Sequence, residues 1–142
     1  MSENREPGMI GHDAFNELLR ICREALPLEA CGVLARSEHA AAPDMVIPVR
    51  NAHNRPADSF AFDPEEWTAV FFAMQKNRQS LVGLYHSHPS QDAVPSVRDR
   101  AGFLPASGVT YWIVSLPPGQ PPRVQPYTVS GGALKPVDLV LA

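Results

Sequence analysis

The chain of 142 residues is long enough for one domain with a hydrophobic core, and 44% of its residues are hydrophobic. Its formal net charge of −3 gives no electrostatic reason to expect nucleic acid as a partner, and no apolar run reaches the roughly 18 residues of a membrane span. The first ten residues lack the basic start and apolar stretch of a secretory signal, which predicts a cytoplasmic protein with Cys22 and Cys31 as reduced thiols.

The first part of the chain alternates between helical and extended patterns. Apolar residues recur at helical spacing over 13–26, where Asp13 is expected to cap a helix that Pro27 closes. Short strands are predicted over 31–35 and 45–49, with a polar turn between them.

A second helix has a strong start signal. Asp63 stands at the cap position, Pro64 at the first helical position and Glu66 three residues after the cap, and the helix is expected to end near residue 78. Residues 81–85 form an apolar run typical of a buried strand, and a third, shorter helix is expected to start near Ser96. Later strands are predicted over 111–116, 123–129 and 133–141. This order predicts a single α/β (α+β) domain over residues 1–142, with a mixed central β-sheet flanked by helices.

Two histidines directly follow the predicted strand 81–85. His86 and His88 are two residues apart, so on extended backbone both imidazoles point to one side and can converge on one point. Asp99, one turn into the expected helix, is placed to bring a carboxylate oxygen to the same point. A catalytic zinc (Zn²⁺) usually has three such protein ligands and an open position for water. An isolated His-x-His pair also occurs in ordinary turns and is weak evidence alone.

Two further residues have both a structural and a catalytic interpretation. Ser96 and Asp99 fit a helix capping box, a role that would compete with a metal for the Asp99 carboxylate. Glu29 lies between Pro27 and the strand 31–35, where a zinc hydrolase needs a carboxylate that takes a proton from water and returns it to the leaving amine. A glutamate at a helix-to-strand junction is more often a solvated charge. Spacing alone does not decide between these interpretations.

Together these residues resemble the JAMM (MPN-plus) family of zinc metallopeptidases, whose pattern is E…HxHx(7)SxxD. Its specified positions are filled in order by Glu29, His86, His88, Ser96 and Asp99. The seven-residue gap is filled by 89–95, and the layout from the first helix to the strand 111–116 is also similar. The resemblance implies zinc ligation by His86, His88 and Asp99. It also implies a general acid/base role for Glu29 and an oxyanion-holding role for Ser96.

The form of the chain also resembles the minimal prokaryotic members of that family. Only residues 100–110 separate Asp99 from the next predicted strand, whereas deubiquitinating members carry extra segments that grip ubiquitin. Such minimal proteins are similar to enzymes that trim or release ubiquitin-like sulfur-carrier proteins ending in Gly-Gly. The resemblance therefore implies cleavage of a peptide or isopeptide bond just after a C-terminal diglycine. Segment 50–61 is expected to form a wall of the groove that holds this tail.

Two other functions stay open from the sequence: a non-catalytic binding module of the same fold, and a zinc amidohydrolase or deaminase that acts on a small molecule. The HxE and CxxC motifs of zinc deaminases are absent from the chain. His12, His39 and His53 lie in polar segments and are expected to be solvated. Cys31 is expected to be a packed thiol, because a fourth protein ligand would block the water position.

Overall fold

A computed structural model describes residues 7–96, 99 and 108–142 of the chain. Its elements are, in chain order, β1 (Gly8–Ile10), α1 (His12–Ala25), β2 (Cys31–Arg36), β3 (Met45–Val49), α2 (Pro64–Lys76), β4 (Ser80–His88), β5 (Thr110–Ser115), β6 (Arg123–Ser130), β7 (Ala133–Pro136) and β8 (Leu139–Leu141). The third helix expected near Ser96 lies largely outside the described residues, although Asp99 itself has helical backbone. Within the described part of the chain, no helix is both long and apolar enough to cross a membrane.

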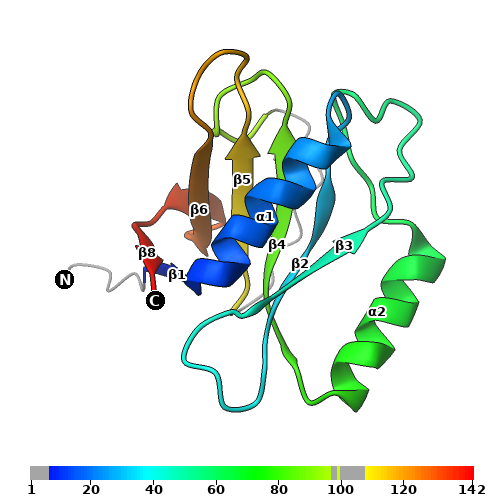
Figure 1. Cartoon of the computed structure of the whole chain (residues 1–142), viewed down its shortest axis with the longest axis vertical. Coiled ribbons are helices and arrows are strands. Elements are labelled where there is room, and N and C mark those ends of the chain that lie inside the picture. Colours follow the sequence, from blue (N-terminus) through cyan, green and yellow to red (C-terminus); the bar gives the residue numbers. More distant parts are fainter. Residues whose placement is uncertain (1–6, 97–98, 100–107) are drawn as a thin grey trace.

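A six-stranded sheet in the order β3-β2-β4-β5-β6-β7 forms the centre of the molecule (Figure 1). β4 and β5 are parallel, and the other neighbours in this sheet are antiparallel. β1 and β8 form a separate parallel pair, which brings the two ends of the described chain together (Figure 1). The predicted class, a mixed sheet flanked by helices, is confirmed.

The two helices cover opposite faces of the central sheet. Neighbouring residues of a strand point to opposite faces. Leu34 of β2 packs in one core cluster with Leu18 of α1, whereas Val33 packs in another with Met74 of α2. Leu18 and Leu34 are fully buried, and each such burial stabilises the fold by about 1.5–3 kcal/mol. The sheet is therefore a rigid support that is packed on both sides.

The starts of the two helices were predicted with different success. Asp63 caps α2 as expected, because its side chain accepts a hydrogen bond from the Glu66 N–H at 3.0 Å and Pro64 occupies the first turn. The predicted Asp13 cap of α1 is wrong. Gly11 is the cap residue and makes no side-chain hydrogen bond there, since the helix begins one residue earlier than expected. Asp13 lies instead in the first turn, where its charge favours the positive end of the helix dipole.

Three strands depart from the prediction. The strand expected over 81–85 extends to His88, so both histidines lie on the strand and not after it. The single strand expected over 133–141 is divided into β7 and β8, because the chain leaves β6 after Pro136 and then pairs with β1. β1 was missed, since three residues are too short to show an alternating pattern. The other boundaries differ from the prediction by at most about two residues.

Candidate metal centre and active site

β4 places both histidines on one face of the sheet at its C-terminal end. The strand register sets His86 between Cys31 of β2 and Ile113 of β5, and sets His88 beside Ser115 of β5. Paired residues in neighbouring strands point to the same face. The histidines therefore lie on the face that α2 covers further along the sheet, and their imidazoles point the same way.

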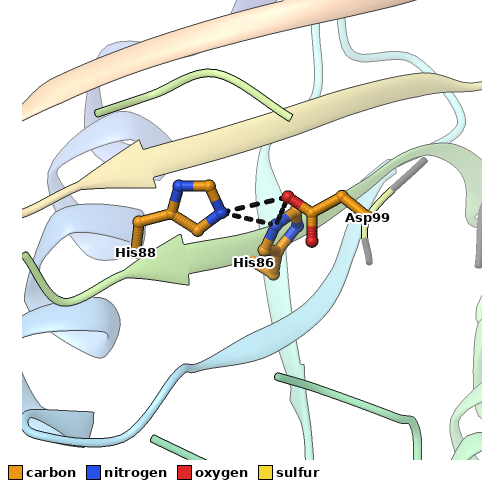
Figure 2. A group of neighbouring side chains, drawn as sticks. All are labelled: His86, His88 and Asp99. Carbon is orange, nitrogen blue, oxygen red and sulfur yellow. Dashed lines mark hydrogen bonds and ion pairs between the residues drawn. The ribbon is translucent and has the colours of Figure 1, made fainter. Parts of the chain in front are cut away.

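His86, His88 and Asp99 form a compact group of possible metal ligands whose ligand atoms all lie within 4.8 Å of one another (Figure 2). The two Nε2 atoms are 3.3 Å apart, and each is 3.0 Å from Oδ2 of Asp99. Two ligands at about 2.0–2.1 Å from a tetrahedral zinc are about 3.3 Å from each other. The observed separations therefore fit three corners of a zinc tetrahedron, and the residues are the three that the sequence predicted.

The tautomer of His88 suits metal binding. Its Nδ1 lies 2.7 Å from the carbonyl oxygen of Asp92, which can only accept a hydrogen bond. Nδ1 therefore carries a hydrogen, and in the neutral imidazole Nε2 is the nitrogen whose lone pair is left for a metal. Two imidazole nitrogens and one carboxylate oxygen are a donor set of catalytic zinc with one position left for water.

Burial and neighbouring charges set the protonation of the group. Burial lowers the pKa of His86, although Asp99 opposes this shift, so its imidazole is neutral at pH 7. Burial also acts to lower the pKa of His88, but its bonds to Asp99 and to the Asp92 carbonyl outweigh it and raise that pKa. Burial acts to raise the pKa of Asp99, yet hydrogen bonds from both histidines hold it well below its usual range. Asp99 is therefore a carboxylate, the form that binds a metal.

Ser96 and Asp99 form a reciprocal helix cap. The Ser96 N–H donates to Asp99 Oδ2 at 2.9 Å, and the Asp99 N–H donates to Ser96 Oγ at 3.0 Å. The predicted capping box is thus present, and Ser96 itself makes it. The oxygen that accepts the Ser96 N–H is the same one that faces the histidines, so the cap and the candidate ligand position share one atom. A carboxylate oxygen has lone pairs for both contacts.

Glu29 is buried beside the ligand group. Its residue exposure is 3%, so its interpretation as a solvated charge is wrong. Ser87 fixes the neighbouring backbone, because its N–H donates to the Ala30 carbonyl at 3.0 Å and its Oγ accepts the Ala30 N–H at 2.8 Å. Continuing the register of β2 and β4 by two residues places Glu29 opposite His88. The charge of Glu29 accordingly helps to raise the pKa of His88.

Asn51 links the backbone of Glu29 to the loop that follows β3. Its Nδ2 donates to the carbonyls of Glu29 at 3.1 Å and Ser59 at 2.9 Å. Its Oδ1 accepts the N–H groups of His53 and Ala61, each at 3.1 Å. Sequence reasoning did not single out Asn51, since nothing local shows that its amide reaches Glu29.

Segment 50–61 contacts His86 and the backbone of Glu29. The Glu29 N–H donates to the Pro56 carbonyl at 2.8 Å. The ring of Phe60 stacks on the imidazole of His86, with centroids 4.4 Å apart and an angle of 21° between the planes. Sequence reasoning missed Phe60, because no spacing rule connects a loop aromatic with a histidine on another strand.

The remaining histidines and cysteines are not members of the ligand group among the described residues. His12 and His39 are exposed, as predicted, whereas His53 is half-buried and its Nδ1 accepts an N–H within its own loop. The Cys31 thiol donates to the Val49 carbonyl at 3.3 Å, and burial raises its pKa to about 12. Cys31 is therefore a packed, protonated thiol.

Known proteins resemble this chain over most of its length. A family model described as prokaryotic homologs of the JAB domain matches residues 12–129. A curated relative, the CysO-cysteine peptidase of Mycobacterium tuberculosis, is 31% identical over 134 residues, which are 93% of this chain and 90% of the relative. The desampylase of Haloferax volcanii is 38% identical over 92 residues, which are 62% of this chain and 66% of the relative.

Solved structures share the same fold. A solution structure of a protein from Desulfitobacterium hafniense has a TM-score of 0.81 and 29% identity, covering 94% of this chain and 92% of that protein. A crystal structure of a JAB1/MPN domain protein from Archaeoglobus fulgidus has a TM-score of 0.58 and 20% identity. The match covers 96% of this chain and 100% of that protein. One of these curated relatives is named a peptidase and the other a desampylase, which supports a hydrolase. The chain belongs to the prokaryotic JAB-domain family, a minimal form of the JAMM/MPN proteins.

Proposed function

We propose that this protein is a zinc-dependent peptidase that cleaves the bond after the C-terminal Gly-Gly of a ubiquitin-like sulfur-carrier protein. The observation that carries the proposal is the convergence of His86 Nε2, His88 Nε2 and Asp99 Oδ2 at zinc-ligand spacing. The names of the relatives support a protein conjugate as substrate. Besides the CysO-cysteine peptidase, they include a probable TtuB-protein conjugate cleaving protease of Thermus thermophilus, 35% identical over 79 residues.

In the proposed reaction, the residues of the site have different roles. His86, His88 and Asp99 hold zinc, which when bound lowers the pKa of water toward about 7 and so supplies a nucleophile at neutral pH. Glu29 takes the proton of the attacking water and returns it to the amine as the C–N bond breaks. The Ser96 hydroxyl donates to the carbonyl oxygen as it becomes negative. One hydroxyl can do this while its lone pair still accepts the Asp99 N–H.

The diglycine tail suits the surroundings of the ligand group. In this proposal, the tail lies extended along segment 50–61, where the Phe60 ring covers one side of His86. Glycine residues have no side chains that would meet this ring, and their backbone can pair with a neighbouring segment. In this proposal the substrate specificity follows from the contact of the tail with the Phe60 ring.

The test combines zinc content with mass-spectrometric detection of cleavage of a sulfur-carrier protein extended beyond its Gly-Gly end. Wild type is compared with His88→Ala, which removes a ligand, and Glu29→Gln, which removes the proton acceptor but no ligand. His39→Ala is the matched control, because it removes an exposed imidazole outside the ligand group. We expect one zinc in wild type, Glu29→Gln and His39→Ala, and none in His88→Ala. Only wild type and His39→Ala should cleave the substrate.

Different failures would contradict different parts of the proposal. A wild-type protein that takes up no zinc when metal is offered would contradict the metallopeptidase and favour a non-catalytic binding module. Stoichiometric zinc without cleavage of any diglycine conjugate would contradict the substrate and favour a hydrolase of another class. An active Glu29→Gln variant would assign the proton transfer to another group.

A further inference from the structure

Three successive backbone carbonyls in the loop after β4 each accept a hydrogen bond from a side chain on a different strand. The pairs are Ser115 Oγ with Gln91, His88 Nδ1 with Asp92 at 2.7 Å, and Tyr127 Oη with Ala93 at 2.6 Å. The donors lie on β5, β4 and β6, which are neighbours in the sheet. The middle donor is the proposed zinc ligand His88, and hydroxyl groups hold the carbonyls on both sides of its partner.

Both hydroxyl donors are buried. The loss of a buried hydrogen bond costs more free energy than the loss of a solvent-exposed one. Ser115 is 1% exposed and Tyr127 is 6% exposed. Ala93 is buried as well, so its carbonyl is not compensated by bulk water when Tyr127 loses its hydroxyl, and the backbone then shifts or bears the cost of desolvation. Gln91 is exposed, and its contact with Ser115 ties the outer side of the loop to β5. Ser115 also lies beside His88 in the register of β4 and β5. The loop is therefore attached to the same rigid sheet that carries the histidines.

This loop connects the two halves of the ligand group. His88 is the last residue of β4, and residues 89–95 lead from it to Ser96, whose amide holds the Asp99 carboxylate. A change in the path of the loop would turn the Asp92 carbonyl away from His88 Nδ1 and move Asp99 relative to both imidazoles. Partners that orient a metal ligand through its second nitrogen typically change metal affinity by about 10–100-fold.

We infer that Ser115 and Tyr127 are positioning residues for the metal centre. Their hydroxyls hold the loop so that the Asp92 carbonyl orients His88 and Asp99 reaches the histidines. This inference rests on the zinc site of the proposed function. It adds two residues, from β5 and β6, that lie outside the motif and do not supply a ligand atom.

The experiment measures zinc affinity of the full chain by competition with a chromophoric chelator. Tyr127→Phe and Ser115→Ala each remove one hydroxyl and leave the ligands in place. We expect a zinc dissociation constant about 10-fold higher in each variant. Thermal unfolding of the metal-free and zinc-saturated proteins is recorded in parallel. A positioning role predicts a smaller rise in unfolding temperature on zinc addition, whereas a purely structural role lowers both temperatures equally.

Tyr85→Phe is the matched control. Tyr85 is also a buried tyrosine of the sheet, but it packs on the face that α1 covers. Among the described residues its hydroxyl has no hydrogen-bond partner. Removing this hydroxyl should leave the zinc dissociation constant unchanged, which shows that the effect at Tyr127 comes from the loop and not from loss of any buried hydroxyl.

Two outcomes would overturn the inference. One is a wild type that binds zinc while Tyr127→Phe and Ser115→Ala bind it with the same affinity; the proposed function would then stand without the positioning role. The other is an equal loss of affinity in Tyr85→Phe. A wild type that binds no zinc would contradict the proposed function itself, so the two failures are distinguishable.

Discussion

The amide of Ser96 donates at 2.9 Å to the Asp99 oxygen that lies 3.0 Å from Nε2 of both histidines. The Asp99 amide returns a bond to Ser96 Oγ at 3.0 Å. The same Asp99 oxygen therefore takes part in the helix cap and faces the two imidazoles. The Ser96 amide holds this carboxylate oriented toward them. Ser96 therefore positions the Asp99 carboxylate, a role separate from its proposed catalytic role.

Ser96→Ala should impair both metal binding and catalysis. Loss of the cap costs about 1 kcal/mol and loosens Asp99, so zinc affinity should fall about fivefold. Loss of the proposed oxyanion donor should lower kcat about 100-fold at saturating zinc. Ser96→Thr keeps the hydroxyl and should retain most of the zinc affinity and most of the kcat. A Ser96→Ala variant with normal kcat at saturating zinc would limit Ser96 to the cap.

Asn51→Asp tests the support of Glu29. The substitution keeps an oxygen for the loop amides but places a second oxygen against the carbonyls of Glu29 and Ser59. Displacement of Glu29 should lower kcat by about 10–100-fold, while the zinc content is retained because the ligands are untouched. Asn54→Asp adds the same charge at an exposed position of the same loop and serves as the control. Equal kcat values in the two variants would contradict a role for Asn51.

Phe60→Ala tests the proposed path of the Gly-Gly tail along segment 50–61. Removal of the ring that stacks on His86 should weaken zinc binding slightly, since such a contact contributes about 0.5–1.5 kcal/mol. It should also reduce the preference for a Gly-Gly tail over a Gly-Ala tail by roughly 10-fold. Competitive cleavage of the two tails measures this ratio. Phe72→Ala removes an aromatic ring that is 62% exposed and should leave the ratio unchanged. An unchanged ratio in Phe60→Ala would place the tail elsewhere.

The cap of α2 predicts a specific pH dependence. The Glu66 N–H and then Arg50 lower the pKa of Asp63, so the ionised carboxylate stabilises the folded state. This contribution is fully present above the unfolded-state pKa of about 3.9 and is lost as the pH falls through the lower folded-state pKa. Unfolding temperatures measured from pH 6 to pH 2 should fall more steeply in wild type than in Asp63→Asn, which keeps a capping oxygen without the charge. Parallel curves would contradict this stabilisation.

Local signals in the sequence predicted much of the fold. The start of α2 and the whole of β3 were correct, because a cap residue with a following proline and a short apolar run act over a few residues. The placement of His86 and His88 on one side of the strand could also be predicted from the sequence, since the period of two along a strand is a local property.

The tertiary structure alone decided the rest. The full length of β4 depends on its pairing with β5, and the division into β7 and β8 depends on where β1 lies. The contacts of Phe60 with His86 and of Asn51 with Glu29 join segments distant in the chain. The sequence by itself determined which side chains are candidates for binding a metal and moving a proton. The distances between these side chains, and the residues that hold them in place, followed only from the strand register and the packing of the loops. No local pattern encodes a contact between distant segments.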